Sequence, residues 1–167
     1  LTLINDVLDL SKIEAGRVEL FNETFELKQI LDDVIKTSLP LAQKNENELI
    51  IDYKTEIDFV TADQTRVKQV VLNLISNACK FTEKGKITVG VNKILREGGD
   101  LISIDVNDTG IGMSDEQMSR LFNSFVQADS STTRKYGGTG LGLTISKQLA
   151  KLMGGNVVVN SELGKGT

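Results

Sequence analysis

Residues 69–82 read QVVLNLISNACKFT, and this stretch decides the fold expected for the chain. It belongs to a long helix that we expect to begin after Asp63, a favourable N-cap residue, and to end near Phe81. Most of the helix is apolar. One polar stripe runs along it at spacings of three and four residues, and it consists of Arg66, Gln69, Asn73, Asn77 and Lys80.

Asparagine is a poor helix former, and a solvated helix face is usually filled with Glu and Lys. Two asparagines in register followed by Lys80 therefore resemble a site for a metal ion and a phosphate. An amide oxygen suits Mg²⁺, and a lysine offers a point charge to phosphate. An ordinary exposed helix face is the alternative interpretation.

The second signal is the loop Asp108-Thr109-Gly110-Ile111-Gly112, which follows the alternating strand residues LISIDV. Its glycines allow the backbone to approach a ligand, and a carboxylate can accept a hydrogen bond from an exocyclic amine such as that of adenine. A tight turn capped by an aspartate is the alternative.

The same region nearly satisfies the spacing of a calcium-binding loop, through Asp105, Asn107, Thr109, Gly110 and Glu116. A helix must enter such a loop, whereas alternating strand residues enter this one. Calcium is therefore rejected.

The third signal is GGTGLGL at residues 137–143, which opens a helix expected over Leu141–Met153. The free N–H groups and the positive dipole at a helix start favour an anion. The stretch is neither a P-loop, since no Gly-Lys-Ser/Thr follows, nor a dinucleotide fingerprint, since no strand precedes it. A glycine-rich hinge is the alternative, and Arg134 and Lys135 stand just upstream, where they could close over phosphates.

The remaining pattern predicts a mixture of helices and strands rather than strict alternation. Helices are expected over 1–15, with Gly16 as its cap, over 27–44, with a kink at Pro40, and through Arg120–Leu121. Short extended pieces are expected at 18–25 and near Phe59, and strands at 48–54, 86–95, 101–106 and 156–160, of which 86–95 and 101–106 are antiparallel. Residues 123–139 have almost no large apolar side chain and suggest a lid. This order predicts an α+β fold, a two-layer sandwich with helices on one face of a mainly antiparallel sheet.

Composition narrows the class of partner. The net charge of −4 and pI near 5.0 give no long-range attraction to nucleic acid or to an anionic membrane. One cysteine and no histidine exclude an internal disulfide and a zinc site. No apolar run approaches the length of a membrane span.

Taken in order, these motifs resemble the catalytic domain of sensor histidine kinases, in the superfamily that includes the ATPase domains of gyrase, Hsp90 and MutL. QVVLNLISNACKFT resembles its N box, DTGIGM and GGTGLGL its first and second glycine boxes, LFNSFVQ its phenylalanine box, and GKGT at 164–167 the start of a third glycine box. LINDVLDLSKIEAG at 3–16 resembles the end of the dimerisation helix of hybrid-type kinases. The resemblance implies the Bergerat ATP-binding fold.

The resemblance also implies roles for individual residues. Asn77 would hold Mg²⁺, Lys80 would contact phosphate and act in catalysis with Asn73, and Asp108 would bind the adenine amine. Phe122 and Phe125 would anchor the stem of a mobile lid. The residues expected to bind the nucleotide are Asn77, Lys80, Asp108, Gly110, Gly112, Arg134, Gly138, Thr139, Gly140, Leu141 and Gly142.

The implied reaction is transfer of the γ-phosphate of Mg·ATP to a histidine on a dimerisation domain. ATPases of the superfamily resemble one another in carrying a glutamate base four residues before the metal-binding asparagine, and here that residue is Asn73. An amide is unable to take a proton from water, so transfer is favoured over hydrolysis. An ATPase and a non-catalytic nucleotide sensor are the alternatives.

We accordingly expect residues 1–16 to be the end of a phosphoacceptor helix and residues 17–167 to be the ATP-binding domain, with its last strand truncated. The acceptor histidine is expected upstream of residue 1. The expected partners are ATP, the histidine-bearing helix bundle and a response regulator receiver domain, with a homodimer in the full-length protein and no nucleic acid. A cytoplasmic location is expected, in a parent protein that can be membrane-anchored.

Overall fold

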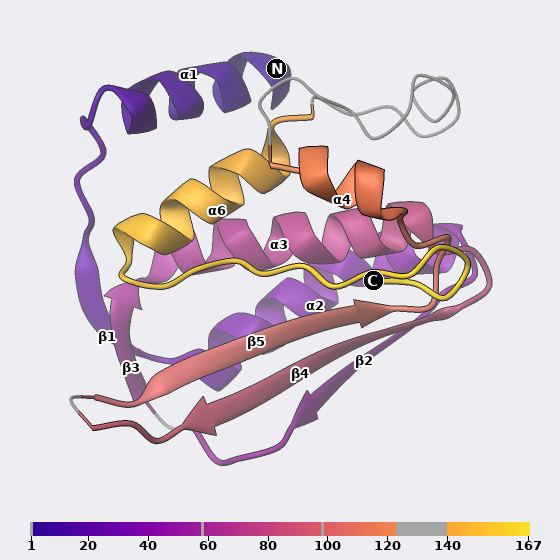
Figure 1. The fold of residues 1–167 in the computed structure, drawn as a ribbon. Helices are drawn as coiled ribbons and strands as arrows, with labels where there is room; N and C mark the ends of the chain where they lie inside the picture. Colours follow the sequence, from indigo (N-terminus) through magenta and orange to yellow (C-terminus); the bar gives the residue numbers. More distant parts are fainter. Residues whose placement is uncertain (1, 58, 98, 123–139) are drawn as a thin grey trace.

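The computed structural model describes residues 2–57, 59–97, 99–122 and 140–167 of the chain. Its helices and strands follow one another as shown in Figure 1. In chain order they are α1 (Thr2–Glu14), β1 (Asn22–Glu26), α2 (Leu27–Lys44), β2 (Glu48–Tyr53), β3 (Phe59–Asp63), α3 (Gln64–Phe81), β4 (Lys86–Ile94), β5 (Leu101–Asp108), α4 (Asp115–Arg120) and α6 (Gly142–Leu152).

The described strands form two separate sheets. In the larger sheet the order is β2-β4-β5, with β2 and β4 parallel and β4 and β5 antiparallel. The smaller sheet pairs β1 with β3 in antiparallel register from Asn22–Asp63 to Glu26–Phe59. The parallel pair is joined through β3 and α3, as a crossover connection requires. The mixed, mainly antiparallel sheet predicted from the sequence is confirmed.

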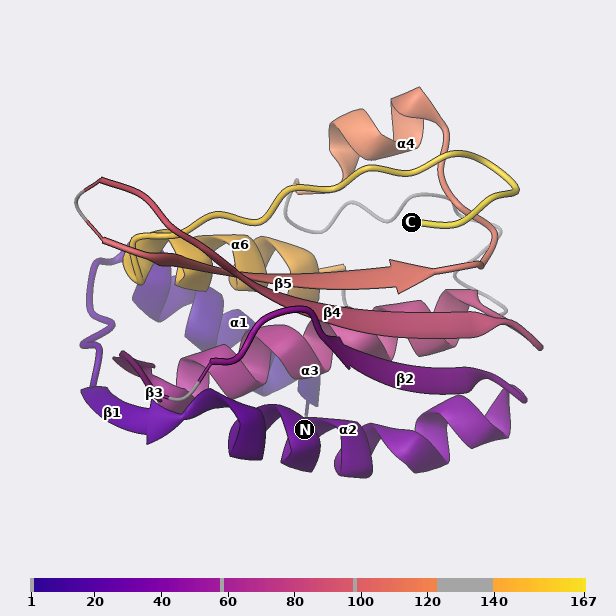
Figure 2. The ribbon, with the colours of Figure 1, turned by 90° about the horizontal axis from the view of Figure 1, so that it is seen from below.

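The helices α2 and α3 cover one face of the larger sheet (Figures 1 and 2). The core between these layers includes Leu31 and Val34 from α2, Ile75 from α3, and Val89 and Val91 from β4, all 1% exposed or less. Each of these side chains contributes about 1.5–3 kcal/mol by its burial. The two-layer α+β sandwich is thus confirmed.

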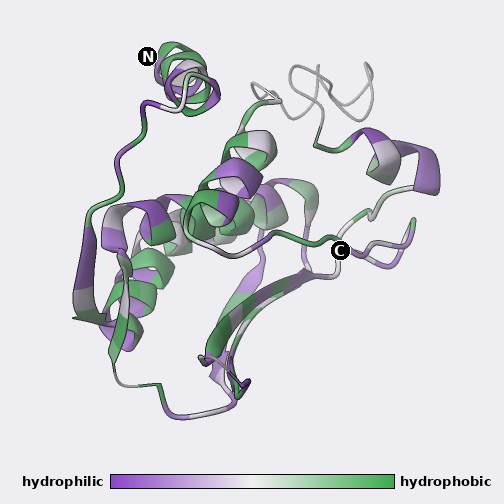
Figure 3. Cartoon of the chain, turned by 60° about the vertical axis from the view of Figure 1, so that its left-hand side comes forward, coloured by the Kyte–Doolittle hydropathy of each residue, from purple (hydrophilic) through white to green (hydrophobic). Residues whose placement is uncertain are grey.

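The helix α6 packs beside α3, and α1 lies over α6 on the side away from the sheet (Figure 1). A second apolar cluster joins Leu10 of α1 to Leu141, Ile145 and Leu149 at and within α6. The hydropathy colouring of Figure 3 shows hydrophobic and hydrophilic residues side by side on α1. The packing of α1 therefore rests on a few apolar contacts.

Local signals predicted most helix ends correctly. Asp63 caps α3, because its Oδ1 accepts a hydrogen bond from the Arg66 N–H at 3.0 Å. Gly16, with φ of +65°, follows α1 and donates its N–H to the Ile13 carbonyl. The helix α2 runs on through Pro40 to Lys44.

The predicted strand at residues 156–160 is wrong. Val157 and Val159 are half-buried and Val158 is 74% exposed, so the segment has the alternation of a one-sided strand. Within the described ranges, however, its backbone makes no hydrogen bond to a neighbouring strand. An alternating pattern of apolar and polar residues indicates which face of a segment is buried, but it does not show that another strand lies beside the segment to pair with it.

None of the helices in the described part of the chain is long and apolar enough to cross a membrane. The expected lid at residues 123–139 lies outside the described residues.

Candidate nucleotide-binding site

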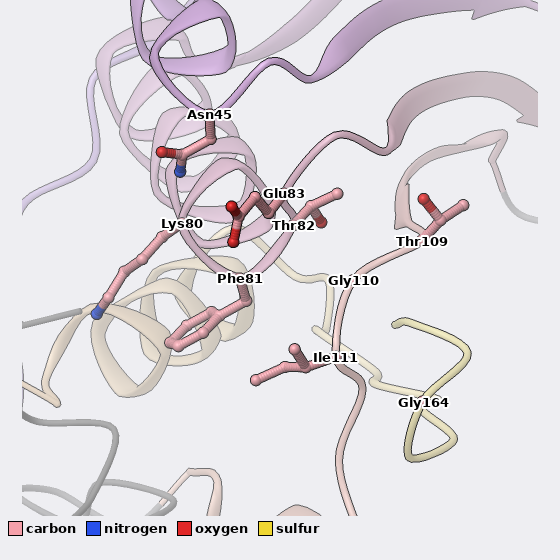
Figure 4. A pocket seen from close by; sticks show the side chains of 9 residues that line it. All are labelled: Asn45, Lys80, Phe81, Thr82, Glu83, Thr109, Gly110, Ile111 and Gly164. Carbon is pink, nitrogen blue, oxygen red and sulfur yellow. The ribbon is translucent and has the colours of Figure 1, made fainter. Parts of the chain in front are cut away.

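A pocket of about 360 Å³ opens where the C-terminal end of α3 meets the loop that follows β5 (Figure 4). It is lined by Asn45, Lys80, Phe81, Thr82, Glu83, Thr109, Gly110, Ile111 and Gly164. Figure 4 shows the Ile111 side chain extending toward the ring of Phe81, and these two lining residues give the pocket an apolar wall. Lys80 and Gly110 were predicted as site residues from the sequence.

Asp108, the last residue of β5, lies beside this pocket. Its Oδ1 accepts hydrogen bonds from the Gly110 N–H at 2.8 Å and from the Thr82 hydroxyl at 3.3 Å. Burial raises the pKa of the Asp108 carboxyl, although the N–H groups of Gly110 and Thr167 and the Thr82 hydroxyl act in the opposite direction. A half-buried carboxylate held in this way is a strong acceptor for a ligand N–H.

The predicted glycines of this loop stand where no side chain fits. A Cβ at Gly110 would clash with the Phe81 carbonyl, and one at Gly112 would clash with the Glu162 carbonyl. Gly112 also has a φ of +62°. The close approach arises because residues 161–167 fold back on the loop, with Gly164 N–H donating to the Ile111 carbonyl at 2.7 Å. Ser161 fixes this contact by accepting from the Met113 N–H at 2.8 Å.

Lys80 and Asn77 lie on the last turn of α3. Burial lowers the pKa of Lys80, and its Nζ stands 4.7 Å from the centroid of the Phe81 ring. Asn77 is half-buried, and its side chain makes no hydrogen bond among the described residues. Both residues stand at the negative end of the helix dipole, which favours a cation nearby.

Asn73, seven residues before Lys80, has a different environment. Its Nδ2 donates to the hydroxyl of Ser146 on α6 at 2.8 Å, and its Oδ1 would clash with a Cβ at Gly142. Seven residues of helix span about 10 Å, and Asn73 does not line the pocket. The structure places this amide at the packing of α3 against α6.

The polar stripe of α3 is in fact divided among three neighbours. At its start, Gln69 donates to Asp9 of α1 at 3.0 Å, and Arg66 donates to Gln69 at 2.8 Å and stands 3.9 Å from the same Asp9. Asn73 faces α6, and only Asn77 and Lys80 lie toward the pocket end. One sequence pattern thus serves packing at one end and the candidate site at the other.

The second glycine motif enters α6. Gly140 has a φ of +70°, Leu141 is fully buried, and Gly142 begins the helix against Asn73. These three residues do not line the pocket. Arg134, Gly138, Thr139 and Phe125 lie outside the described residues.

Phe122 lies just before the residues that the structure leaves undescribed, and it contacts α6. Its carbonyl accepts a hydrogen bond from the Thr144 hydroxyl at 3.2 Å, and Lys147 Nζ stands 3.8 Å from its ring centroid. Phe122 therefore contacts α6, and its expected role as an anchor of the lid stays a prediction.

Several lining residues carried no recognised signal in the sequence. No spacing pattern in the sequence singles out Thr82 or Asn45 as a site residue, and Glu83 looks like an ordinary surface residue. The closest clue was the position of Thr82 at the end of the stretch that decides the fold.

The chain has the fold of a histidine kinase catalytic domain. The structure of full-length ShkA in complex with AMPPNP superposes with a TM-score of 0.86 at 33% identity, covering 99% of this chain and 33% of that one. The catalytic domain of histidine kinase ThkA gives a TM-score of 0.67 at 25% identity, covering 80% of this chain and 82% of that domain.

Residues 62–167 match the family described as histidine kinase-, DNA gyrase B-, and HSP90-like ATPase, and the chain belongs to this family. All of the chain aligns with hybrid signal transduction histidine kinase B of Dictyostelium discoideum at 46% identity, and with the signal transduction histidine-protein kinase BarA of Escherichia coli (strain K12) at 41% identity. It spans 9% and 18% of the lengths of these two relatives.

Proposed function

We propose that this chain binds Mg·ATP in the pocket at the end of α3 and passes the γ-phosphoryl group to a histidine on a partner helix bundle. The observation that carries the proposal is that Lys80 and Gly110 line one pocket, while the Asp108 carboxylate lies beside it and accepts hydrogen bonds from two lining residues, Gly110 and Thr82. The family of the chain supports a nucleotide as the ligand.

In this proposal the residues in and beside the pocket bind separate parts of the nucleotide. Asp108 accepts a hydrogen bond from the amine of adenine, and Gly110 and Gly112 permit the close backbone packing that holds the loop beside it. Phe81 and Ile111 provide an apolar wall beside the base. Lys80, whose charge is partly desolvated, attracts the phosphates more strongly than an exposed lysine would.

A magnesium ion fits the donors at this end of α3. The amide oxygen of Asn77 is a suitable hard ligand, and the helix end favours a cation. The described residues contain no group of three acidic, Cys or His side chains that could hold a metal on its own. Magnesium needs none here, because it is commonly bound through one or two protein ligands together with substrate phosphates. When bound it would neutralise charge on the phosphoryl oxygens.

Transfer is preferred to hydrolysis because α3 offers no general base at residue 73. The amide of Asn73 is unable to take a proton from water, and it is hydrogen-bonded to Ser146. A histidine acceptor needs mainly correct positioning, since its nitrogen is already nucleophilic. The chain contains no histidine, so the acceptor belongs to another part of the parent protein or to a partner.

Calorimetric titration with Mg·ATP tests the binding half of the proposal. Asp108→Asn should weaken binding about 10- to 100-fold, which corresponds to loss of a hydrogen bond to a charged group. Asp105→Asn on the same strand is the matched control, because Asp105 is exposed and, among the described residues, its carboxylate accepts a hydrogen bond only from the Ser103 hydroxyl. It should bind ATP like the unaltered protein.

Equal affinities of the Asp108→Asn variant and the unaltered protein would remove Asp108 from the site. A steady-state hydrolysis assay on the same samples should show little turnover. Rapid, sustained release of phosphate would instead assign the chain an ATPase activity, the second reaction found among relatives of this fold.

A further inference from the structure

Thr82 is the residue immediately after α3 and is 1% exposed. It lines the pocket, and its hydroxyl donates to Oδ1 of Asp108 at 3.3 Å. Together with the Gly110 N–H, this hydroxyl gives Oδ1 two donors and so fixes the plane of the carboxylate. Thr82 therefore controls which direction Asp108 presents to a ligand.

A second buried residue holds Thr82 in place. Asn47, 8% exposed in the turn between α2 and β2, donates its Nδ2 to the carbonyls of Thr82 at 2.8 Å and Cys79 at 3.2 Å. Its Oδ1 accepts from the Gly85 N–H at 3.1 Å. One side chain thus hydrogen-bonds to the last turn of α3 and to both ends of the short turn that carries Thr82.

Steric contacts restrict the same turn. A Cβ at Gly85 would lie 2.5 Å from the Cγ2 of Thr82 and 2.6 Å from the Oγ1 of Thr109. Thr109 in turn accepts a hydrogen bond from the Lys86 N–H at 2.9 Å. The turn at residues 82–85 is therefore clamped between Asn47 on one side and the Asp108 loop on the other.

We propose that Thr82, held by Asn47, is a specificity-determining positioning residue that orients the Asp108 carboxylate toward the exocyclic amine of adenine. The inference rests on the proposed function, because it assumes that Asp108 contacts this amine. Without the hydroxyl, Asp108 would keep only the Gly110 donor on Oδ1 and could rotate away from the base. The base amine would then lose a well-placed acceptor, while the phosphate contacts would be unaffected.

Comparing two nucleotides isolates this effect. Purine riboside 5′-triphosphate has the same ring, sugar and phosphates as ATP but lacks the 6-amino group. We measure the dissociation constants of both with magnesium for the unaltered protein, for Thr82→Val, which keeps the shape and loses the hydroxyl, and for Thr82→Ser, which keeps the hydroxyl. Thr37→Val is the matched control, since Thr37 loses a hydroxyl on the exposed face of α2.

We expect Thr82→Val to weaken ATP binding about 5- to 20-fold while the analogue changes less than about twofold. Thr82→Ser should restore most of the discrimination between the two nucleotides, and Thr37→Val should not alter it. Equal loss for both nucleotides would show that Thr82 only supports the pocket wall, and unchanged ATP binding would also overturn the inference.

Failure of the proposed function gives a different result. The unaltered protein would then bind ATP and the analogue equally, or bind neither, before any substitution is made. If the unaltered protein prefers ATP to the analogue and Thr82→Val keeps this preference, the role of Thr82 is overturned while the proposed function stands.

Asn47 is tested separately, because its removal also affects folding. Asn47→Asp keeps the acceptor for Gly85 but loses both donor bonds to carbonyls, and it should lower the discrimination in the same direction as Thr82→Val. Val34→Ala, which opens a cavity in α2 away from the pocket, serves as a control of similarly reduced unfolding temperature. If Val34→Ala lowers discrimination equally, Asn47 acts only through stability.

Discussion

Asp108 shows how a binding residue can oppose the stability of its own fold. Burial raises the pKa of its carboxyl above 3.8, so the folded state binds a proton here more tightly than the unfolded chain does. A raised pKa means that the free energy of unfolding falls as the pH rises from 3.8 through the pKa in the folded state. At neutral pH the ionised carboxylate is therefore retained at a cost to stability.

Asp108→Asn should consequently raise the unfolding temperature of the nucleotide-free protein at pH 7, although it weakens ATP binding. An asparagine oxygen can still accept from Gly110 and Thr82, so the local hydrogen bonds survive. Thermal unfolding of both proteins from pH 3 to pH 8 measures the difference. The difference in unfolding temperature should be absent at a pH below 3.8 and constant at a pH above the pKa of Asp108 in the folded protein. A variant less stable than the unaltered protein at pH 7 would contradict the raised pKa of Asp108.

Alanine substitutions at two glycines with similar φ angles distinguish the cost of backbone strain from the cost of a steric clash. Gly112 and Gly154 have φ of +62° and +81°, but only Gly112 has an atom in the way of a Cβ, the Glu162 carbonyl. Gly154→Ala should cost about 1–2 kcal/mol for its positive φ alone. Gly112→Ala should cost about 2 kcal/mol more, because the loop at residues 161–167 must move. Chemical unfolding measures both, and equal costs would show that the loops are not tightly packed.

At the level of elements, α1 is held against the domain by an apolar cluster that includes Leu10 and Ile13 and by the carboxylate of Asp9. Leu10 is 5% exposed within the cluster of α6, and Asp9 meets Arg66 and Gln69 of α3. Leu8, two residues earlier on the same helix, is 52% exposed. Leu10 is thus the buried apolar anchor of α1 in this cluster.

Leu10→Ala should release α1, because removing a buried leucine typically costs about 2–5 kcal/mol. Hydrogen exchange of the α1 amides should become much faster, while exchange in β4 stays slow. Leu8→Ala provides the comparison on the same helix and should leave the exchange rates of α1 nearly unchanged. If both variants behave alike, the contact of α1 with α6 does not hold the helix.

At the scale of the whole molecule, the sequence predicted what depends on local pattern. Residue spacing and capping preferences predicted the cap at Asp63, the helix that follows it and the two-layer α+β arrangement. Side-chain neighbours far along the chain were not predictable in this way. The stripe on α3 is divided by Asp9 and Ser146, which lie 60 and 73 residues away in sequence.

The candidate site shows the same limit. Lys80 and Gly110 were found through motifs, whereas Thr82 and Asn47 have their importance only through contacts that folding creates. The expected strand at residues 156–160 failed because alternation needs a neighbour to pair with. The metal-binding role of Asn77 and the catalytic role of Asn73 stay predictions.

Phosphoryl transfer is the central claim, and one measurement tests it most directly. The chain is joined at residue 1 to a helix bundle that carries a histidine, incubated with γ-labelled Mg·ATP, and the label on the protein is tested for stability in acid and in base. We predict acid-labile, base-stable label that disappears when the histidine is replaced by glutamine and falls strongly with Asp108→Asn. Tight ATP binding with no such label, or release of the label to water as free phosphate, would contradict the account.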